Sequence, residues 1–312
     1  MMSEPSISIA MCVYNGERYI RQQLDSFVAQ TRRPDELVVC DDASSDATAE
    51  IVAEFARTAP FDVRLWTQPS NVGRIANFEK AISLCTKELI FLSDADDVWH
   101  AGKLDSMSRV LAAAPGATGV FCDAEIVDAA LKPLGYSHFD HRGFTPRMQL
   151  QLRNGDAFEP LLGSRIVQGA ALAFRASCRP TLLPLSAHWG QDSWIAVLLA
   201  ASGDLLCVND NLMSYRQHDA NLVGAMRRRP ARLERLARKL RHPRSHYRDA
   251  LKATMYAGRQ LDDLQERLAR QGELVHSARL REAMDRRRWR LKRRRFVIGT
   301  LLTILGDRPQ AA

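Results

Sequence analysis

Short apolar runs alternate with amphipathic segments through the first 130 residues. The runs predict strands at 7–13, 36–42, 63–68, 88–94 and 118–123. Between them, apolar residues recur at three- and four-residue spacing, as in ERYIRQQLDSFVAQ, which is typical of helices. Because strand and helix alternate, the pattern predicts βαβ units: an α/β fold with a mostly parallel central sheet and helices on both faces.

The alternation ends after about residue 131. Residues 138–158 are polar and irregular in pattern. Residues 164–175 predict a strand that contains a glycine, residues 190–203 a helix that begins at or just before Asp192, and residues 204–218 a further strand. No internal repeat or low-complexity linker separates these segments.

Charge divides the chain into two parts. Residues 227–312 hold 25 Lys and Arg against 9 Asp and Glu, whereas residues 1–226 hold 19 against 27. We therefore expect an acidic domain at 1–226, which holds the motifs described below and would be the catalytic one if they act in catalysis, and a basic helical extension at 227–312. Six cysteines are scattered singly, mostly in apolar runs, with no CxxC pair and no signal peptide pattern, which predicts a cytoplasmic protein with reduced thiols.

Polar side chains collect where the predicted parallel strands end. Tyr14 follows the first strand, Asp42 ends the second, and Asp94 and Asp96 follow the fourth. In open parallel sheets, ligands bind outside the carboxyl ends of the strands. A pair of carboxylates there suits Mg²⁺ or Mn²⁺, which is held by one or two carboxylates together with substrate phosphates. By itself such a pair also fits a solvated loop or a helix cap.

Two other enzyme classes fit less well. Phosphohydrolases of the haloacid dehalogenase type place Asp-x-Asp after the first strand of their core, but here it follows the fourth, and GDLLCVND has the wrong spacing for their later motif. Dinucleotide-binding oxidoreductases need G-x-G-x-x-G after the first strand, whereas VYNGERY holds one glycine.

Several ordered motifs together carry a resemblance. SIAMCVYNGERYIRQQLDSFVAQT, ELVVCDDASSDAT, NVGRIANFEKAI and LIFLSDADDVWHAGKL resemble the family 2 glycosyltransferases, and the rhamnosyltransferase-like branch of bacterial enzymes in particular. GQDSWIAVLLAASG and YRQHDANLVG resemble later motifs of that branch, so the resemblance covers residues 6–224. It implies a glycosyltransferase A-type fold and inverting, metal-assisted sugar transfer from a nucleotide diphosphate donor, dTDP-rhamnose or a UDP-sugar, to an acceptor hydroxyl in surface polysaccharide assembly.

The resemblance also implies roles for single residues. Tyr14 would stack on the donor base, Asp42 would hydrogen-bond it, Asp94 would lie near the ribose and the metal, and Asp96 would bind the metal. Asp192 matches the general base, although this family usually has Glu or His where this chain has Gln191. One carboxylate on the face opposite the leaving group gives inversion.

For several further candidate site residues, a purely structural role is an alternative to the functional one. The nucleotide-binding candidates are Asn15, Asp41, Asn71 and Arg74. Asp41 equally fits a turn, and Arg74 fits an ordinary surface position. His218 is a further metal candidate, against a structural histidine. The sugar or acceptor pocket candidates are Trp99, Gly169, Gln191 and Arg216, with core packing as the alternative for Trp99.

The basic extension has its own set of readings. Leu233, Leu236 and Leu240 lie at helical spacing among arginines, and the apolar run 296–305 is too short to span a bilayer. A peripheral contact with the cytoplasmic face of the inner membrane, where a lipid-linked saccharide acceptor would be met, is one expectation. The alternative is a non-catalytic protein that binds nucleic acid or a membrane surface through its arginines.

Overall fold

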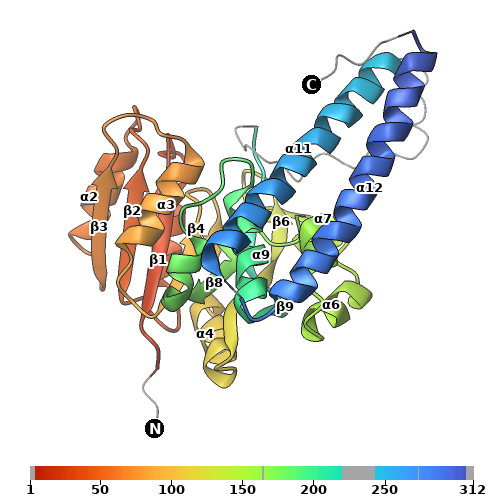
Figure 1. Ribbon diagram of the computed structural model, residues 1–312. Coiled ribbons are helices and arrows are strands. Elements are labelled where there is room, and N and C mark those ends of the chain that lie inside the picture. The colour runs from red at the N-terminus through yellow and green to blue at the C-terminus, as the bar shows by residue number, and fades with distance from the viewer. Residues whose placement is uncertain (1–3, 164, 220–242, 273, 307–312) are drawn as a thin grey trace. The chain divides into compact units, whose positions relative to one another are not determined.

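The computed structural model describes residues 4–163, 165–219, 243–272 and 274–306. The chain divides into two compact units, 1–224 and 225–312. The first unit is built on one nine-stranded sheet with helices on both faces (Figure 1), which confirms the predicted α/β fold class.

Four parallel strands form the first half of the sheet, in the order β3-β2-β1-β4. They are β1 (Ile7–Val13), β2 (Glu36–Asp41), β3 (Asp62–Thr67) and β4 (Leu89–Ser93). All residues of β1, β2 and β4 are buried, which explains their unbroken apolar runs, because a strand covered on both faces has no solvent side. Their carboxyl ends therefore meet at one edge of the sheet.

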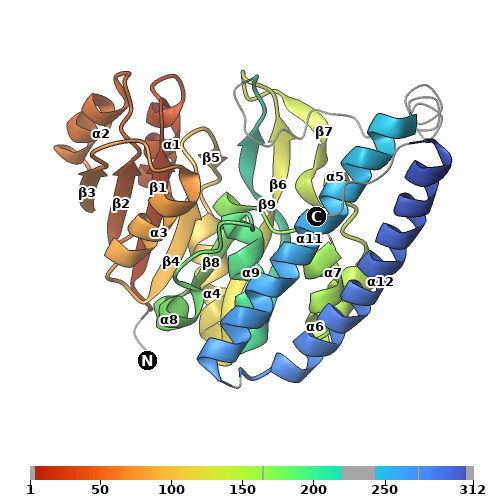
Figure 2. The ribbon, with the colours of Figure 1, turned by 45° about the horizontal axis from the view of Figure 1, so that its top comes forward.

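The helices of this half change from one face of the sheet to the other beside β1. Helices α1 (Ile20–Val28) and α2 (Thr48–Ala56) connect strands that step away from β1 in one direction, and α3 (Arg74–Leu84) returns across it to β4. Right-handed crossovers then put α3 on the opposite face (Figure 2). The strand order reverses between β1 and β4, and such a switch point is where open α/β sheets bind ligands.

The second half of the sheet is joined through an antiparallel strand. Strand β8 (Leu172–Arg175) lies between β4 and β6 (Ala117–Val127) and is antiparallel to both. Beyond it, β6 pairs in parallel with β9 (Asp204–Arg216). Two shorter strands complete the sheet: β5 (Val98–Trp99) on β9 and β7 (Pro133–Ser137) on β6.

The remaining helices of this unit cover the sheet and its margins. Helix α9 (Gln191–Ser202) packs on β6 and β9, as does α4 (Lys103–Ala113). The short helices are α5 (His138–Arg142), α6 (Pro146–Arg153), α7 (Phe158–Gly163) and α8 (Arg179–Leu182), with 3₁₀ turns at Gly169–Ala171 and Ala176–Cys178.

Two predictions for this region were wrong. The segment 138–158 is not irregular: α5 and α6 begin at side-chain caps on Ser137 and Thr145, and a proline begins α6. The strand predicted at 164–175 is confined to β8, because Gly169 to Ala171 form a 3₁₀ turn whose Ala170 carbonyl accepts a hydrogen bond from the Lys103 ammonium group. This turn becomes important for the site.

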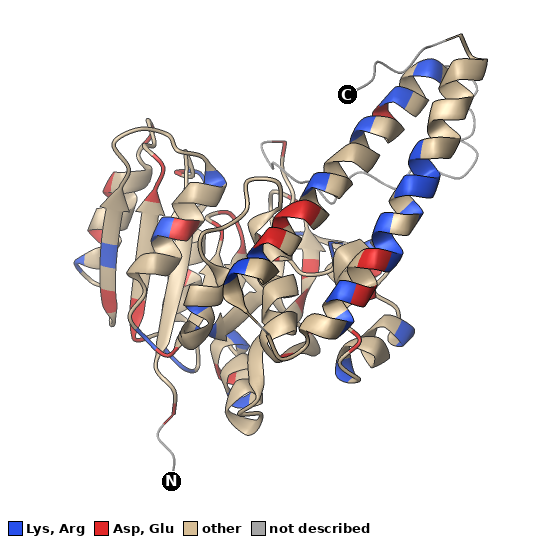
Figure 3. Cartoon of the chain, in the orientation of Figure 1, with Lys and Arg blue, Asp and Glu red and all other residues tan. Residues whose placement is uncertain are grey.

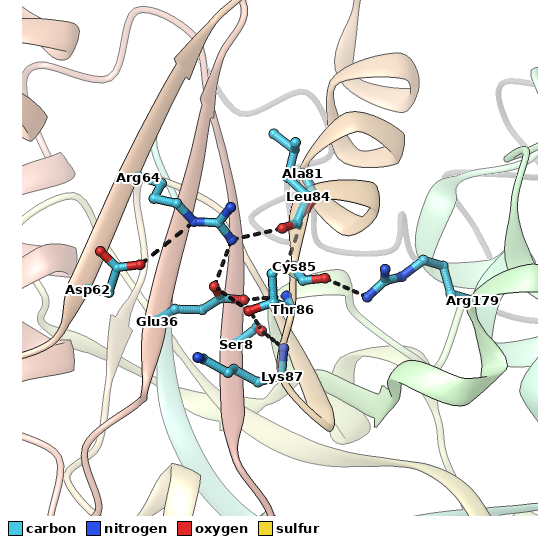
Figure 4. Close-up of polar contacts among 10 residues, drawn as sticks. All are labelled: Ser8, Glu36, Asp62, Arg64, Ala81, Leu84, Cys85, Thr86, Lys87 and Arg179. Atoms are coloured by element: carbon cyan, nitrogen blue, oxygen red, sulfur yellow. Dashed lines mark hydrogen bonds and ion pairs between the residues drawn. The ribbon is translucent and has the colours of Figure 1, made fainter.

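A buried polar cluster closes the opposite, amino-terminal edge of the sheet (Figure 4). The Glu36 carboxylate accepts hydrogen bonds from the Ser8 hydroxyl and from the amide and hydroxyl of Thr86, and it pairs with Arg64 at 2.7 Å. Burial by itself raises the pKa of Glu36, but the hydrogen bonds from Ser8 and Thr86, with Arg64, outweigh it and hold this pKa below its usual value. Glu36 therefore joins β1, β2 and the start of β4 as an anion.

We expect Glu36→Gln to destabilise the protein by about 2–3 kcal/mol at neutral pH, because the neutral amide leaves this charge-assisted network unmade. A lowered native pKa contributes stability that is present above about pH 4.3, the unfolded carboxyl value, and is lost as pH falls through the native pKa. The variant should therefore lose less stability on acidification. Urea unfolding at several pH values measures this, with the exposed Glu88→Gln as control. Equal acid sensitivity in Glu36→Gln and wild type would contradict it.

The second unit contains two long helices, α11 (Pro243–Gln271) and α12 (Ser277–Ile304). They pack side by side and antiparallel (Figures 1 and 2), and Arg288 of α12 donates hydrogen bonds to Asp262 and Gln265 of α11. Leu233, Leu236 and Leu240 lie outside the described residues. Within the described parts of the chain, no helix combines the length and the apolar character that crossing a bilayer requires.

Candidate active site

The acid-bearing loop after β4 lies at the switch point of the sheet. Asp94 and Asp96 follow β4 directly, and Tyr14 and Asn15 follow the neighbouring β1. The Tyr14 ring is 54% exposed, so it is open to a ligand. The Asn15 side chain accepts a hydrogen bond from the Ser45 amide at 2.8 Å and so links this loop to the one after β2.

The two aspartates that end β2 have different surroundings. Both oxygens of Asp42 accept hydrogen bonds from backbone amides, those of Val72 at 2.7 Å and Gly73 at 2.9 Å. Asp42 thereby fixes the turn before α3, which carries the nucleotide candidates Asn71 and Arg74. Asp41 accepts from the amide and hydroxyl of Ser44, which is the turn-forming arrangement that the sequence left open.

Asp94 stands between the other charged candidates. Burial raises the pKa of its carboxyl group to about 7, and the negative charges of Asp96 and Asp192 add to this, whereas Arg74 and Lys103 oppose it. The contacts across the site agree with this: Lys103 donates to the Ala170 carbonyl, and the neighbouring Gly169 lies beside Asp192. The fold therefore brings the predicted base, Asp192, to the same site as the acid pair, although 98 residues separate Asp94 from Asp192 in the sequence.

The end of β9 supplies the other wall of the acid loop. His218 Nε2 lies 2.9 Å from Asp96 Oδ2, and the His218 ring lies 4.7 Å from that of Tyr19. Arg216 is buried: its guanidinium donates to the Asp96 carbonyl at 2.7 Å, and its backbone amide donates to Asp97 Oδ1 at 3.2 Å. Through these hydrogen bonds Arg216 stabilises the conformation of the acid loop. This is a structural role, and it differs from the sugar contact predicted for Arg216.

Trp99 is also a core side chain in this structure. It is 3% exposed and packs edge-on against Phe27 at 4.8 Å, and the Lys103 ammonium group lies 3.8 Å from the centre of its ring. Trp99 therefore packs in the core, which was the structural alternative for this residue, and we do not assign it a contact with a sugar.

Lys103 is a further residue of the site that was not predicted from the sequence. Its side chain is fully buried on the inner face of α4, where burial lowers the pKa of its ammonium group to about 8. The spacing of Lys103 with the buried Leu104, Met107 and Leu111 was the available signal, because a lysine on an apolar helix face needs a partner. Here the partner is the carbonyl of Ala170, so Lys103 ties the acid side of the site to the turn that contains Gly169.

Gly169 and the start of α9 form the far wall. A side chain at Gly169 would come within 3.3 Å of Gln191 Nε2 and 3.9 Å of Asp192 Cβ. Asp192 lies in the first turn of α9, whose N-cap is Gly190, and its Oδ1 accepts from the Ser193 amide at 2.7 Å. Asp192 is therefore not the N-cap of α9, which was the structural alternative for this residue. The hydrogen bond from the Ser193 amide uses Oδ1 and not Oδ2.

Several enclosed polar atoms around these loops have no hydrogen-bond partner among the described residues. Gln191 is 1% exposed, yet neither its Oε1 nor its Nε2 is paired. Unpaired buried polar groups are rare and call for water, an ion or a ligand. The others that belong to this edge of the sheet are the Tyr19 hydroxyl, Asp97 Oδ2, Trp99 Nε1 and Gln168 Oε1.

The metal candidates Asp94, Asp96 and His218 do not form a ready cage. In the described part of the chain, no three His, Cys, Asp or Glu side chains are arranged to hold a metal ion. Mg²⁺ and Mn²⁺ are commonly bound by one or two carboxylates with substrate phosphates completing the shell, so the oxygen donors of Asp94 and Asp96 fit such an ion. The raised pKa of Asp94 shows that its negative charge is poorly compensated by the protein alone.

Comparison with known proteins identifies the fold and the family. Residues 8–162 match the family described as Glycosyl transferase family 2. This region, just under half of the chain, is therefore a member of that family. The family 2 match covers the strands and loops that supply Tyr14, Asp42, Asp94 and Asp96, but ends before Gly169, Asp192 and His218.

Curated relatives of this chain are distant. An uncharacterized protein of Mycobacterium tuberculosis is 28% identical over 221 residues, which is 68% of this chain and 59% of that protein. An uncharacterized glycosyltransferase of Nostoc is 27% identical, over 69% of this chain and 66% of its own. A UDP-Glc:α-D-GlcNAc-diphosphoundecaprenol β-1,3-glucosyltransferase of Escherichia coli is 35% identical over 33% of this chain and 40% of its own. The match therefore spans about three fifths of the first of these relatives.

Solved structures agree in fold. S. aureus TarS 1–349 in complex with UDP-GlcNAc superposes with a TM-score of 0.57 at 16% identity, covering 90% of this chain and 72% of that one. The mannosyltransferase PcManGT from Pyrobaculum calidifontis, in complex with GDP-Man and Mn²⁺, has a TM-score of 0.53 at 20% identity, covering 96% and 86%. They support the glycosyltransferase A-type fold predicted for this family 2 member.

Proposed function

We propose that this glycosyltransferase transfers a sugar from a nucleotide diphosphate donor to an acceptor hydroxyl with inversion, assisted by Mg²⁺ or Mn²⁺. The observation that carries the proposal is the position of Asp94, which interacts electrostatically with the acid Asp96 on one side and with Asp192 on the other. In this proposal the acid loop binds the diphosphate and Asp192 acts as the base, the two groups that transfer to a hydroxyl requires.

The loops at the switch point would bind the nucleotide. The exposed ring of Tyr14 is a stacking surface for the base, and Asn15 and Asp42 shape the loops on either side of it. Arg74, in the first turn of α3, opposes the rise in the pKa of Asp94, and we propose that its guanidinium contacts a phosphate of the donor.

Asp94 and Asp96 would hold the divalent cation, with His218 keeping Asp96 in position or joining the shell. When bound, such a cation stabilises the charge that develops on the leaving diphosphate. Burial, and then the negative charge of Asp96, raise the pKa of Asp94, and a bound cation would favour its ionised form.

The far wall would bind the sugar and the acceptor. Gln191 offers an amide with both polar atoms unpaired, and this amide packs closely against the backbone of Gly169, where a side chain would come within 3.3 Å of Gln191 Nε2. Because Gln191 is 1% exposed, we propose that it shapes this wall from behind Gly169 and Asp192. Asp192 would take the proton of the attacking acceptor hydroxyl as the bond from the anomeric carbon to the diphosphate oxygen breaks on the opposite side.

We further propose dTDP-rhamnose or a UDP-sugar as the donor and a saccharide of a bacterial surface polysaccharide, carried on a lipid, as the acceptor. The motifs of the rhamnosyltransferase-like branch favour the first donor, whereas the E. coli relative uses UDP-Glc and a diphosphoundecaprenol-linked acceptor by its name. TarS was solved with UDP-GlcNAc, which keeps the UDP-sugars among the candidates.

Calorimetric titration with UDP, dTDP and GDP, each with and without Mn²⁺, tests the donor assignment. We expect one uridine or thymidine nucleotide to bind at least about tenfold more tightly with Mn²⁺ than without it, because the cation links the carboxylates to the diphosphate. Preference for GDP would contradict the proposed donors. Binding that ignores Mn²⁺ for all three nucleotides would contradict the metal assignment.

A further inference from the structure

Helix α12 presents an exposed apolar strip that packing within its helix pair does not explain. Trp289 is 61% exposed, Phe296 76% and Ile304 74%. These positions, with Val297 between them, are separated by seven, one and seven residues, and therefore lie on one side of the helix.

The opposite side of α12 is the buried one. Ile298 and Leu302 are buried, and each is two residues from an exposed apolar residue, Phe296 and Ile304. Two residues correspond to a rotation of about 200° around the helix axis. The helix therefore has a core-facing side and, separately, an outward apolar strip, whereas a helix that packs on one side only needs apolar residues only there.

Positive charge surrounds this strip. Eight of the ten residues from 286 to 295 are Arg or Lys, and none is acidic. Lys292, Arg293, Arg294 and Arg295 are all exposed, and the Arg293 guanidinium lies 5.6 Å from the centre of the Trp289 ring. In Figure 3 the blue segments of α12 give way to tan toward its end at Ile304.

We propose that this face of α12 binds the surface of an anionic lipid bilayer. Arg and Lys attract the headgroups, and Trp289, Phe296, Val297 and Ile304 enter the boundary between headgroups and acyl chains, where aromatic and aliphatic side chains of interfacial helices are buried. The arrangement matches a helix that lies in the plane of the membrane surface.

A nucleic acid fits this face less well. Its phosphates would pair with the arginines, but a phosphate backbone offers nothing to cover Phe296, Val297 and Ile304, which extend past the last basic residue of the run, Arg295. The inference does not rest on the proposed function, because lipid binding is a property of this helix and is measured without donor or acceptor.

Vesicle co-sedimentation of the full chain tests the proposal. We expect binding to vesicles of phosphatidylcholine with phosphatidylglycerol, weak binding to phosphatidylcholine alone, and a decrease as salt rises. The triple variant Trp289→Ser/Phe296→Ser/Ile304→Ser should bind anionic vesicles at least about tenfold more weakly, because it keeps every charge and loses the apolar contact.

The matched control is Tyr256→Ser/Val275→Ser, which removes exposed apolar side chains outside α12 and should bind within about twofold of wild type. Circular dichroism verifies that both variants stay helical. Unchanged vesicle binding by the triple variant would overturn the proposal. The proposal would also be overturned if the chain bound a labelled single-stranded oligonucleotide more tightly than anionic vesicles and the triple variant changed neither affinity. The arginines would then form a surface for nucleic acid.

Discussion

Replacing Asp192 by asparagine is expected to lower the rate of sugar transfer by about 10²–10⁴-fold while nucleotide binding with metal stays within about threefold of wild type. The amide keeps the size of the side chain and can still accept from the Ser193 amide, as Asp192 Oδ1 does at 2.7 Å. What it loses is the ability to take a proton from the acceptor hydroxyl.

The measurement is the steady-state transfer rate with the donor that calorimetry selects, and its dependence on pH. Ser193→Ala is the matched control, because it removes the hydroxyl next to Asp192 and leaves the carboxylate. Loss of the acidic limb of the pH profile in Asp192→Asn would mark Asp192 as the base. A rate within about threefold of wild type would assign the base to another residue and leave the nucleotide assignments intact.

Replacing Asp96 by asparagine is expected to weaken Mn²⁺-dependent nucleotide binding by about 100-fold, and to leave the weaker metal-independent binding nearly unchanged. A neutral amide oxygen is a poor substitute for a carboxylate at a site where one or two carboxylates do most of the protein's share of metal binding. The Asp96 side chain is 25% exposed, so the variant should fold.

Two further variants make this result specific. Asp25→Asn, on the outer face of α1 in an exposed pair with Arg21, removes one negative charge far from the loop and should have no effect. His218→Gln separates the two roles of the histidine: a loss of about tenfold fits a residue that positions Asp96, and a loss as large as that of Asp96→Asn fits a direct ligand. Metal-dependent binding by Asp96→Asn at the wild-type level would contradict the assignment.

The sequence predicted the elements of the first half of the sheet closely, because local patterns determine them. Strand β1 was expected at 7–13 and is Ile7–Val13, and β4 was expected at 88–94 and is Leu89–Ser93. A strand buried on both faces is a run of apolar residues whatever surrounds it. The position of Asp94 and Asp96 at a strand end followed from the same runs.

Prediction was weaker where a distant partner decides the conformation. The segment 164–175 has the composition of a strand, yet Gly169 to Ala171 form a 3₁₀ turn, and the carbonyl of Ala170 accepts a hydrogen bond from Lys103, more than 60 residues earlier. Trp99 and Arg216 were candidates for the sugar pocket, and both are buried in the core. The residues next to Trp99 in the sequence do not show whether its indole ring packs against a sugar or, as here, against Phe27.

The sequence by itself determined that strands and helices alternate, that carboxylates follow the fourth strand, and that basic residues gather after 226, because each depends on residues close together in the chain. Only the tertiary structure decided which of these residues meet. β4 pairs with β1, the end of β9 brings His218 to Asp96 across 122 residues, and α9 brings Asp192 into the electrostatic range of Asp94. Contacts over such separations depend on strand order and packing, which the local pattern does not encode.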